Sequence, residues 1–230
     1  TAGVGKLMHN PWKPAWDEYG LKQDYTPIAF SGTKKVGHPS VPDPYRNLDP
    51  LDASFARLSD VPVIEADGEV PGHSGWDSFP YHKTFHYVKE QERDRLPDER
   101  TADWAIDKLE QWEKGNLKKT FFLGVGFIRP HTPLVVPDYY FNKFPIDKII
   151  LPLHLNGDEE YCHFEENYLP GKSKGRKHFD ALMASFENEE VALKTYLQAY
   201  HASIAFMDDQ VGSVLQKLEE TSFIENTIVV

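Results

Sequence analysis

Cysteine is almost absent from this sequence of 230 residues, which contains only Cys162. One cysteine forms no intrachain disulfide and offers no zinc-ligand spacing, so a disulfide framework and a structural zinc site are excluded. No apolar run approaches the ~18 residues of a membrane-spanning helix, so no membrane partner is expected. The sequence also lacks an Asn-x-Ser/Thr sequon, which favours a bacterial source over a lysosomal one.

Positive charge is scarce as well. The chain has 25 Lys and Arg residues against 36 Asp and Glu residues, a formal net charge of −11. This balance argues against a nucleic-acid partner, because such proteins usually present a basic face. The charge balance does not exclude an anionic substrate, because a local pocket can be positive inside an acidic protein. With 40% hydrophobic residues, the chain has enough apolar surface to form a core.

The first half of the chain shows little periodicity. Residues 11–100 are rich in Pro, Gly, Asp and Trp, which predicts long irregular loops. Beyond them the spacing predicts a helix over 99–114, capped by Asp98 or Thr101. The apolar run 120–127 that follows is typical of a central strand of a parallel sheet. A helix followed by such a strand indicates a βαβ arrangement and an α/β fold with a mostly parallel central sheet.

The second half is predicted to contain a short helix near 138–144 and a long helix from 188 to about 220. The apolar residues of the long helix step by three or four, which predicts one buried stripe. Its members are Leu197, Tyr200, Ile204, Met207, Val211, Val214 and Leu218. Residues 227–230 are expected to begin a strand, whereas residues 161–187 carry no clear pattern.

Two glycine motifs fail as nucleotide sites. Gly3-Val4-Gly5-Lys6 is followed by Leu7, so it lacks the hydroxyl that binds magnesium in a phosphate loop. Gly124-Val125-Gly126 follows a predicted strand, but Arg129 stands where a dinucleotide loop needs its third glycine.

Lys6 and His9 are a first pair of candidate site residues. They are three residues apart, so on a helical turn they would share a face. A cation and an imidazole together can bind an anion and move a proton. The alternative is a surface lysine beside a capping histidine.

His131 is a second candidate, together with Arg129. His131 directly follows the predicted strand 120–127, and the carboxyl ends of parallel strands are where α/β sites lie. Pro130 and Pro133 restrict the backbone around it, and Arg129 offers a contact for an anion. A turn histidine bonded to the backbone is the alternative.

The sequence predicts no metal site. Asp208 and Asp209 are adjacent, so on a helix they point about 100° apart and cannot chelate one ion together. Cys162 has no base pattern around it and is expected to be an inert thiol. The remaining histidines lack ligand spacing and are interpreted as surface or loop residues: His38, His73, His82, His86, His154, His163, His178 and His201.

Three segments together resemble type I sulfatases. Residues 4–9 (VGKLMH) are similar to the Gly-Lys-x-x-His segment of that family. Residues 123–134 (LGVGFIRPHTPL) are similar to its strand-loop L-x-V-G-[FY]-x-[KR]-P-H-x-P-[FL], and residues 200–212 (YHASIAFMDDQVG) to its helix Y-x-A-S-[VI]-x-[FY]-[ML]-D-x-Q-V-G. They occur in the family's order and are most like the branch of iduronate-2-sulfatase and bacterial polysaccharide sulfatases.

The resemblance implies an alkaline-phosphatase-like α/β fold, with residues 1–230 as a partial sulfatase catalytic domain. It also implies a formylglycine nucleophile, made in a C/S-x-P-x-R motif, and one Ca²⁺ ion. Lys6 would then bind a sulfate oxygen and the formylglycine, and His9 the formylglycine hydroxyl. His131 would bind sulfate and help to protonate the leaving oxygen.

The sequence departs from the family by lacking C/S-x-P-x-R. That motif is expected before Thr1, and an Asp-His pair and a second lysine after Val230, so the formylglycine and the Ca²⁺ ligands are expected outside this chain. The sheet would be incomplete at both ends, and the chain alone inactive.

The expected substrate is a sulfated sugar or polysaccharide, and the expected location periplasmic or secreted. The residues proposed to stack on sugars are Trp12, Trp16, Trp76, Tyr81 and Tyr87. Two rival interpretations are a phosphodiesterase or phosphonate hydrolase of the same superfamily and a non-catalytic protein that binds sulfated glycans.

Overall fold

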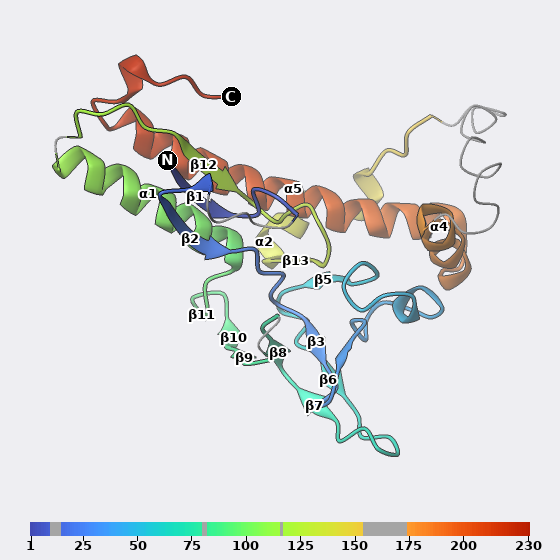
Figure 1. The fold of residues 1–230 in the computed structure, drawn as a ribbon. Coiled ribbons are helices and arrows are strands. Elements are labelled where there is room, and N and C mark those ends of the chain that lie inside the picture. Colours follow the sequence, from blue (N-terminus) through green and yellow to red (C-terminus); the bar gives the residue numbers. More distant parts are fainter. Residues whose placement is uncertain (10–14, 80–81, 116, 154–173) are drawn as a thin grey trace.

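A computed structural model describes residues 1–9, 15–79, 82–115, 117–153 and 174–230 (Figure 1). Its largest sheet has three strands in the order β12-β1-β2. These are β1 (Ala2–Gly5), β2 (Glu18–Lys22) and β12 (Leu123–Gly126), and β1 runs parallel to both neighbours. The parallel α/β arrangement expected from the sequence is therefore present.

The apolar run 120–127 forms a shorter strand than predicted. Only β12 is paired, and Phe122 before it is 60% exposed. Among the described strands the central place belongs to β1, all four residues of which are buried. A strand of only four residues offers too little pattern for recognition from sequence.

The predicted helix at 99–114 is confirmed as α1 (Pro97–Lys114), but its cap differs from the expectation. The helix starts with Pro97 in its first turn, where a proline costs no hydrogen bond. The carboxylate of Glu99 accepts the backbone N–H of Leu96 at 2.7 Å. Asp98 and Thr101 therefore do not cap α1, and the carboxylate of Asp98 is available for another contact.

The long helix is confirmed as α5 (Glu189–Glu219), and the side chain of Asn188 accepts the N–H of Val191 at 3.0 Å. The predicted buried stripe is wrong, because Tyr200 and Ile204 are 37% and 36% exposed. The face that packs on α1 and β13 carries mostly small side chains, which let the backbones approach closely. The buried residues of α5 are Ala192, Ala199, Ala202, Ser203, Phe206, Gln210 and Leu218.

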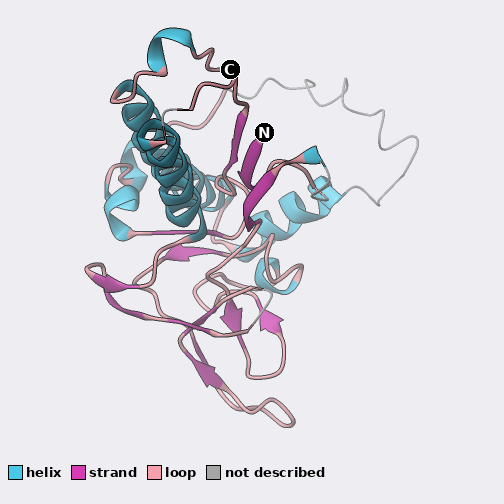
Figure 2. Ribbon diagram, turned by 60° about the vertical axis from the view of Figure 1, so that its left-hand side comes forward, coloured by secondary structure: helices cyan, strands magenta, loops and turns pink. Residues whose placement is uncertain are grey.

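The region expected to be irregular contains a series of short strands. Two of them pair in parallel, β5 (Phe55–Arg57) with β13 (Leu134–Val136). The others form antiparallel pairs in a lobe below the helices (Figure 2). These are β3 (Ala29–Phe30) with β4 (Lys35–Val36), β6 (Val63–Ile64) with β7 (His73–Ser74), β8 (Trp76–Asp77) with β9 (Thr84–Phe85), and β10 (Tyr87–Lys89) with β11 (Glu92–Arg93).

The remaining helices are short. The helix predicted near 138–144 is confirmed as α2 (Asp138–Asn142), and α4 (Lys174–Ser185) occupies part of the unassigned region. The described residues also form 3-10 turns at Tyr45–Asn47, Ile146–Lys148 and Ile224–Asn226. Residues 227–230 pair with no strand in the part of the chain that the structure describes, so the strand predicted there is not formed.

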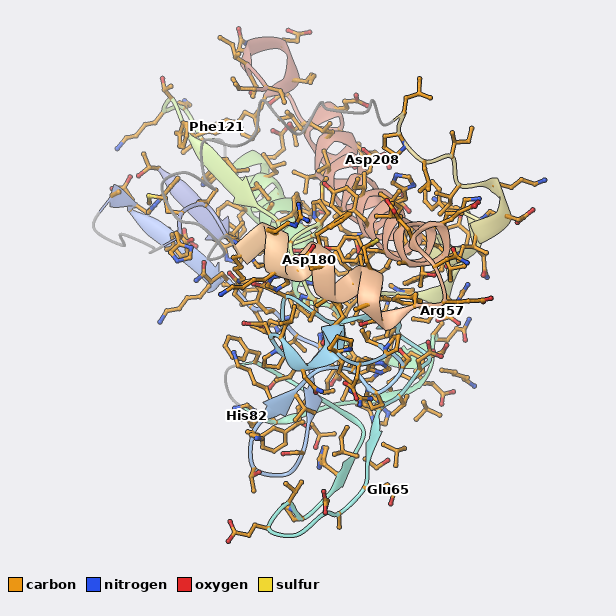
Figure 3. All side chains as sticks on the ribbon, turned by 90° about the vertical axis from the view of Figure 1, so that its right-hand side faces the viewer. Arg57, Glu65, His82, Phe121, Asp180 and Asp208 are labelled. Carbon is orange, nitrogen blue, oxygen red and sulfur yellow. The ribbon has the colours of Figure 1, made fainter. Side chains whose placement is uncertain are left out.

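The main core lies where β5 and β13 meet α4 and α5. Its fully buried members include Leu58, Trp76, Leu134, Val136 and Phe206. Exposed acidic residues such as Asp208 on α5 and Asp180 on α4 point away from it (Figure 3). None of the described helices is long and apolar enough to cross a membrane.

At the junction of β1 with β12, substitution of one glycine is expected to destabilise the fold strongly. Gly5 has φ of +77°, and a Cβ there would collide with the carbonyl oxygen of Gly126, which accepts the N–H of Lys6. We expect Gly5→Ala to lower the free energy of unfolding by about 2 kcal/mol or more.

Gly212→Ala is the matched control, because Gly212 lies in α5 with open space around it. That change should raise the free energy of unfolding by about 0.5–1 kcal/mol. Urea unfolding of the two variants measures both effects, and equal effects would contradict the proposed clash.

Candidate active site

Two neighbouring parallel strands place Lys6 and His131 at the same edge of the sheet. Gly5 of β1 is in register with Gly126 of β12, and the backbone N–H of Lys6 donates to the Gly126 carbonyl at 2.8 Å. Both strands therefore end side by side at this edge of the sheet. β1 is followed by Lys6, and β12 is followed by the loop that carries His131. This edge is where ligand sites of α/β proteins lie.

The ring of Tyr25 contacts both side chains. The Lys6 ammonium lies 5.2 Å from the centre of the Tyr25 ring. The His131 ring lies 5.1 Å from the same centre, tilted by 57°. A cation, an imidazole and a phenol thus form one cluster. Tyr25 was not singled out from the sequence, because it follows β2 in a segment with no recognisable motif.

A turn holds Tyr25 in place. The backbone N–H of Thr26 donates to the Asp24 carboxylate at 2.9 Å, and the Thr26 hydroxyl donates to the same oxygen. That hydroxyl also accepts the backbone N–H of Phe79 at 2.9 Å. The residues on either side of Tyr25 are therefore fixed, which limits the directions that its ring can take.

Arg129 takes a different position from the one expected. It is only 3% exposed, and one guanidinium nitrogen donates to the backbone carbonyls of Thr26 and Val135, at 3.1 and 3.3 Å. A guanidinium in the interior does not offer its charge to a ligand in solvent. Arg129 instead ties the turn that holds Tyr25 to the loop that carries His131.

Asp98, in the first turn of α1, supports the same loop from the other side. Its carboxylate accepts the backbone N–H groups of Ile128 and Arg129 at 2.6 and 2.9 Å. Burial raises the pKa of Asp98 and lowers the pKa of Arg129, because each charge loses water, and the mutual attraction of the two charges opposes both shifts. Two buried and oppositely charged groups thus lie beneath the site.

The orientation of His131 is set by its own loop. Its Nδ1 lies 2.7 Å from the backbone carbonyl of Thr132, and a carbonyl can only accept, so Nδ1 carries the hydrogen. Its backbone N–H donates to the Ile128 carbonyl at 2.8 Å. The backbone bond proposed as the alternative role is present, yet His131 stays exposed. Its Nε2 remains available to a ligand as a proton acceptor, or as a donor after protonation.

An ion pair lies behind His131. The Thr132 hydroxyl donates to the Asp52 carboxylate at 2.7 Å, and Lys174 of α4 pairs with the other oxygen of Asp52. Burial raises the pKa of Asp52, but the hydrogen bonds from Lys174 and Thr132 and the nearby charges outweigh it, so the net shift is downward. Asp52 is therefore a carboxylate at neutral pH.

His9 does not join this cluster in the part of the chain that the structure describes. Residues 6–9 form bends, so the helical turn expected to align Lys6 with His9 is absent. His9 is exposed, and its backbone carbonyl accepts the side-chain amide of Gln23 at 3.3 Å.

Three of the aromatic residues expected to stack on sugars are described, and they lie elsewhere. Trp76 is 1% exposed and its indole N–H donates to the Leu58 carbonyl at 2.9 Å. Trp16 packs across Gly3 and Gly124 of the sheet, and Tyr87 packs against the main core. Trp12, Tyr81 and Cys162 lie outside the described residues.

No metal centre is formed by the described residues, among which no three His, Cys, Asp or Glu side chains gather closely enough to hold an ion. Asp209 of α5 instead faces Lys143 at 3.9 Å, as expected for a residue paired with a neighbouring loop.

A comparison with family models matches residues 39–230 to the family described as Sulfatase. The chain belongs to the sulfatase family. Membership confirms the alkaline-phosphatase-like α/β fold expected from the motifs. The matched range includes Arg129 and His131, whereas Lys6 and His9 precede it.

Curated sulfatases are among the relatives. A sulfatase of Formosa agariphila is 30% identical over 238 residues, which cover 100% of this chain and 38% of that protein. Human iduronate 2-sulfatase is 28% identical over 141 residues, covering 58% of this chain and 24% of its own length. The chain thus spans less than two fifths of these relatives.

Two more distant matches complete the comparison. The multifunctional alkaline phosphatase superfamily protein PehA of Trinickia caryophylli is 23% identical, over 83% of this chain and 41% of its own length. Among solved structures, the sulfatase yidJ from Bacteroides fragilis matches with a TM-score of 0.33 at 21% identity, covering 63% of this chain and 25% of that one.

The buried pair beneath the site yields a stability prediction. Asp98→Asn would leave Arg129 as a buried charge without its counter-charge, so we expect the free energy of unfolding to fall by about 3 kcal/mol. Replacing both partners, as Asp98→Asn with Arg129→Met, should cost less than the sum of the single changes. Urea unfolding of the three variants tests this coupling.

Asp107→Asn is the matched control, because Asp107 lies on the exposed face of α1. We expect its effect to stay within about 0.5 kcal/mol. Additive costs for Asp98 and Arg129 would show that the two charges do not act on each other.

Proposed function

We propose that the protein hydrolyses a sulfate ester on a sulfated sugar or polysaccharide, with residues 1–230 forming part of a sulfatase catalytic domain. The observation that carries this proposal is the cluster of Lys6, Tyr25 and His131 at the carboxyl ends of two parallel strands. A sulfate ester needs cations for its oxygens and a proton for the departing alkoxide, and this cluster offers both.

Each predicted site residue has a role in the proposal. The Lys6 ammonium binds a sulfate oxygen, and His131 Nε2 gives a proton to the leaving oxygen. His9 is proposed to act on the hydroxyl of the formylglycine. Arg129 was expected to contact the substrate directly. Its buried position instead favours a role as a positioning residue that aligns the His131 loop.

Formylglycine and Ca²⁺ enter the proposal through the family. Neither fits the residues at hand, because the sequence has no C/S-x-P-x-R motif and the described residues gather no set of metal ligands. In the complete protein, a formylglycine residue would supply the nucleophile, and a bound Ca²⁺ ion would supply further positive charge for the sulfate. The iduronate-2-sulfatase-like branch and a periplasmic or secreted location also belong to the proposal, the branch supported by relatives named iduronate 2-sulfatase.

The second candidate function is hydrolysis of a phosphodiester or phosphonate. It is favoured by the likeness to PehA, which is named as a multifunctional member of the alkaline phosphatase superfamily. A tetrahedral phosphoryl group would need the same cation and proton donor. Rates of the complete protein on 4-nitrophenyl sulfate and on bis(4-nitrophenyl) phosphate distinguish the two, and turnover of neither favours the glycan-binding interpretation.

Substitutions in the cluster should lower activity. On 4-nitrophenyl sulfate, we expect Lys6→Ala and His131→Asn to reduce kcat/KM of the complete protein by about 100-fold or more, because each removes charge stabilisation or proton transfer. Lys119→Ala is the matched control, since Lys119 is exposed and lies before the opposite, amino end of β12. Equal rates in all variants would contradict the assigned roles.

Residues 1–230 expressed alone should not turn over an aryl sulfate, because the sequence contains no C/S-x-P-x-R motif from which formylglycine is made. A chromogenic assay of this polypeptide, beside the complete protein as positive control, measures the difference. Turnover at enzymatic rates would mean that the nucleophile comes from residues of this chain.

A further inference from the structure

A row of aromatic and cationic side chains, each in contact with the next, starts at the candidate site. The ring of Phe79 lies 6.0 Å from the ring of Tyr25 and meets it edge-on, at 72°. The Lys35 ammonium lies 4.8 Å from the centre of the Phe79 ring. The order is therefore Lys6, Tyr25, Phe79, Lys35, with a lysine at each end and two rings between them.

The exposure and charge of this row are suited to binding a ligand. All four side chains are half-buried. Among the described residues, neither Lys6 nor Lys35 has a carboxylate within ion-pairing distance, whereas Lys174 of the same region is paired with Asp52. An aromatic face attracts an ammonium without neutralising its charge, so each lysine can still bind an anion.

Backbone hydrogen bonds hold the row together. The Phe79 N–H donates to the Thr26 hydroxyl at 2.9 Å, next to Tyr25. Ile28 and Asp77 exchange backbone hydrogen bonds of 2.9 and 3.0 Å, which fixes the two segments against each other. Lys35 stands in β4, which pairs with β3 just after Ile28. Lys35 thus stands in a strand, and the turns that carry Tyr25 and Phe79 are tied to each other by hydrogen bonds.

We propose that Tyr25, Phe79 and Lys35 form a subsite for a second anionic group of the substrate, a deepening that rests on the proposed function. The sugar beside the one that carries the scissile sulfate stacks on the two rings, as apolar sugar faces do on aromatic side chains. Lys35 binds a sulfate or carboxylate on that neighbouring sugar. The protein thereby selects multiply charged glycans over singly charged ones.

The test uses the complete protein and three synthetic disaccharides with the same terminal sulfate ester. The neighbouring sugar carries a second sulfate, a carboxylate or only hydroxyl groups. We expect a lower KM for the two dianionic substrates. Lys35→Gln should reduce this preference by about threefold to tenfold, the size of a partly screened charge contact. Which dianion loses more identifies the anion that Lys35 binds.

Lys34→Gln is the matched control, because Lys34 is the exposed neighbour of Lys35 and carries the same charge. It should keep the wild-type preference. Phe79→Leu keeps an apolar side chain but removes the ring, so KM should rise for all three disaccharides by about threefold. An unchanged preference in Lys35→Gln, or the same loss in Lys34→Gln, overturns the subsite.

Failure of the subsite and failure of the proposed function are separable. If 4-nitrophenyl sulfate is hydrolysed but wild-type protein treats the three disaccharides alike, the subsite is wrong and the sulfatase function stands. If no sulfate ester is hydrolysed, calorimetric titration with the same disaccharides still tests the subsite. Tighter binding of the dianions that is lost in Lys35→Gln then supports it, and equal binding overturns it.

Discussion

The carboxylate of Asp98 accepts the backbone N–H groups of Ile128 and Arg129, and the path of the loop that carries His131 depends on these two hydrogen bonds. These hydrogen bonds fix the backbone to the first turn of α1, just after the end of β12. The side chain of Arg129 is buried and donates to the carbonyl of Thr26. One buried carboxylate thus aligns His131 directly and Tyr25 through the arginine.

This arrangement shows why a buried charge can serve a site that it never touches. Two buried opposite charges are weak support for stability, since the loss of hydration offsets much of the attraction between them. Arg129 contributes by orienting the backbone, because its guanidinium donates to two backbone carbonyls from separate segments. An apolar pair of the same volume could fill the space but could not fix the two segments relative to each other.

The sequence was sufficient for features that repeat over many residues or rest on a motif. Helices α1 and α5 follow from helical spacing, although the predicted cap of α1 and the predicted stripe of α5 were wrong. The loop with His131 follows from its prolines and the strand before it. The sequence was insufficient where long-range packing decides. The face of α5 that packs inward carries mostly small side chains, because close approach of the backbones to α1 and β13 outweighs the burial of large apolar residues.

The same limit applied to the site. Arg129 has a side chain that commonly binds anions, and only its burial next to Asp98 indicates a positioning role. Tyr25 lies in a turn without periodicity, so nothing local indicates that its ring meets Lys6 and His131. Trp76 has the ring expected of a sugar platform but is a core residue, whereas Tyr25 and Phe79 face the cations. Under the proposed function, Tyr25 and Phe79 are the rings that matter, because they lie beside lysines that pair with no carboxylate among the described residues. Stacking and charge can then act on one ligand at the same time.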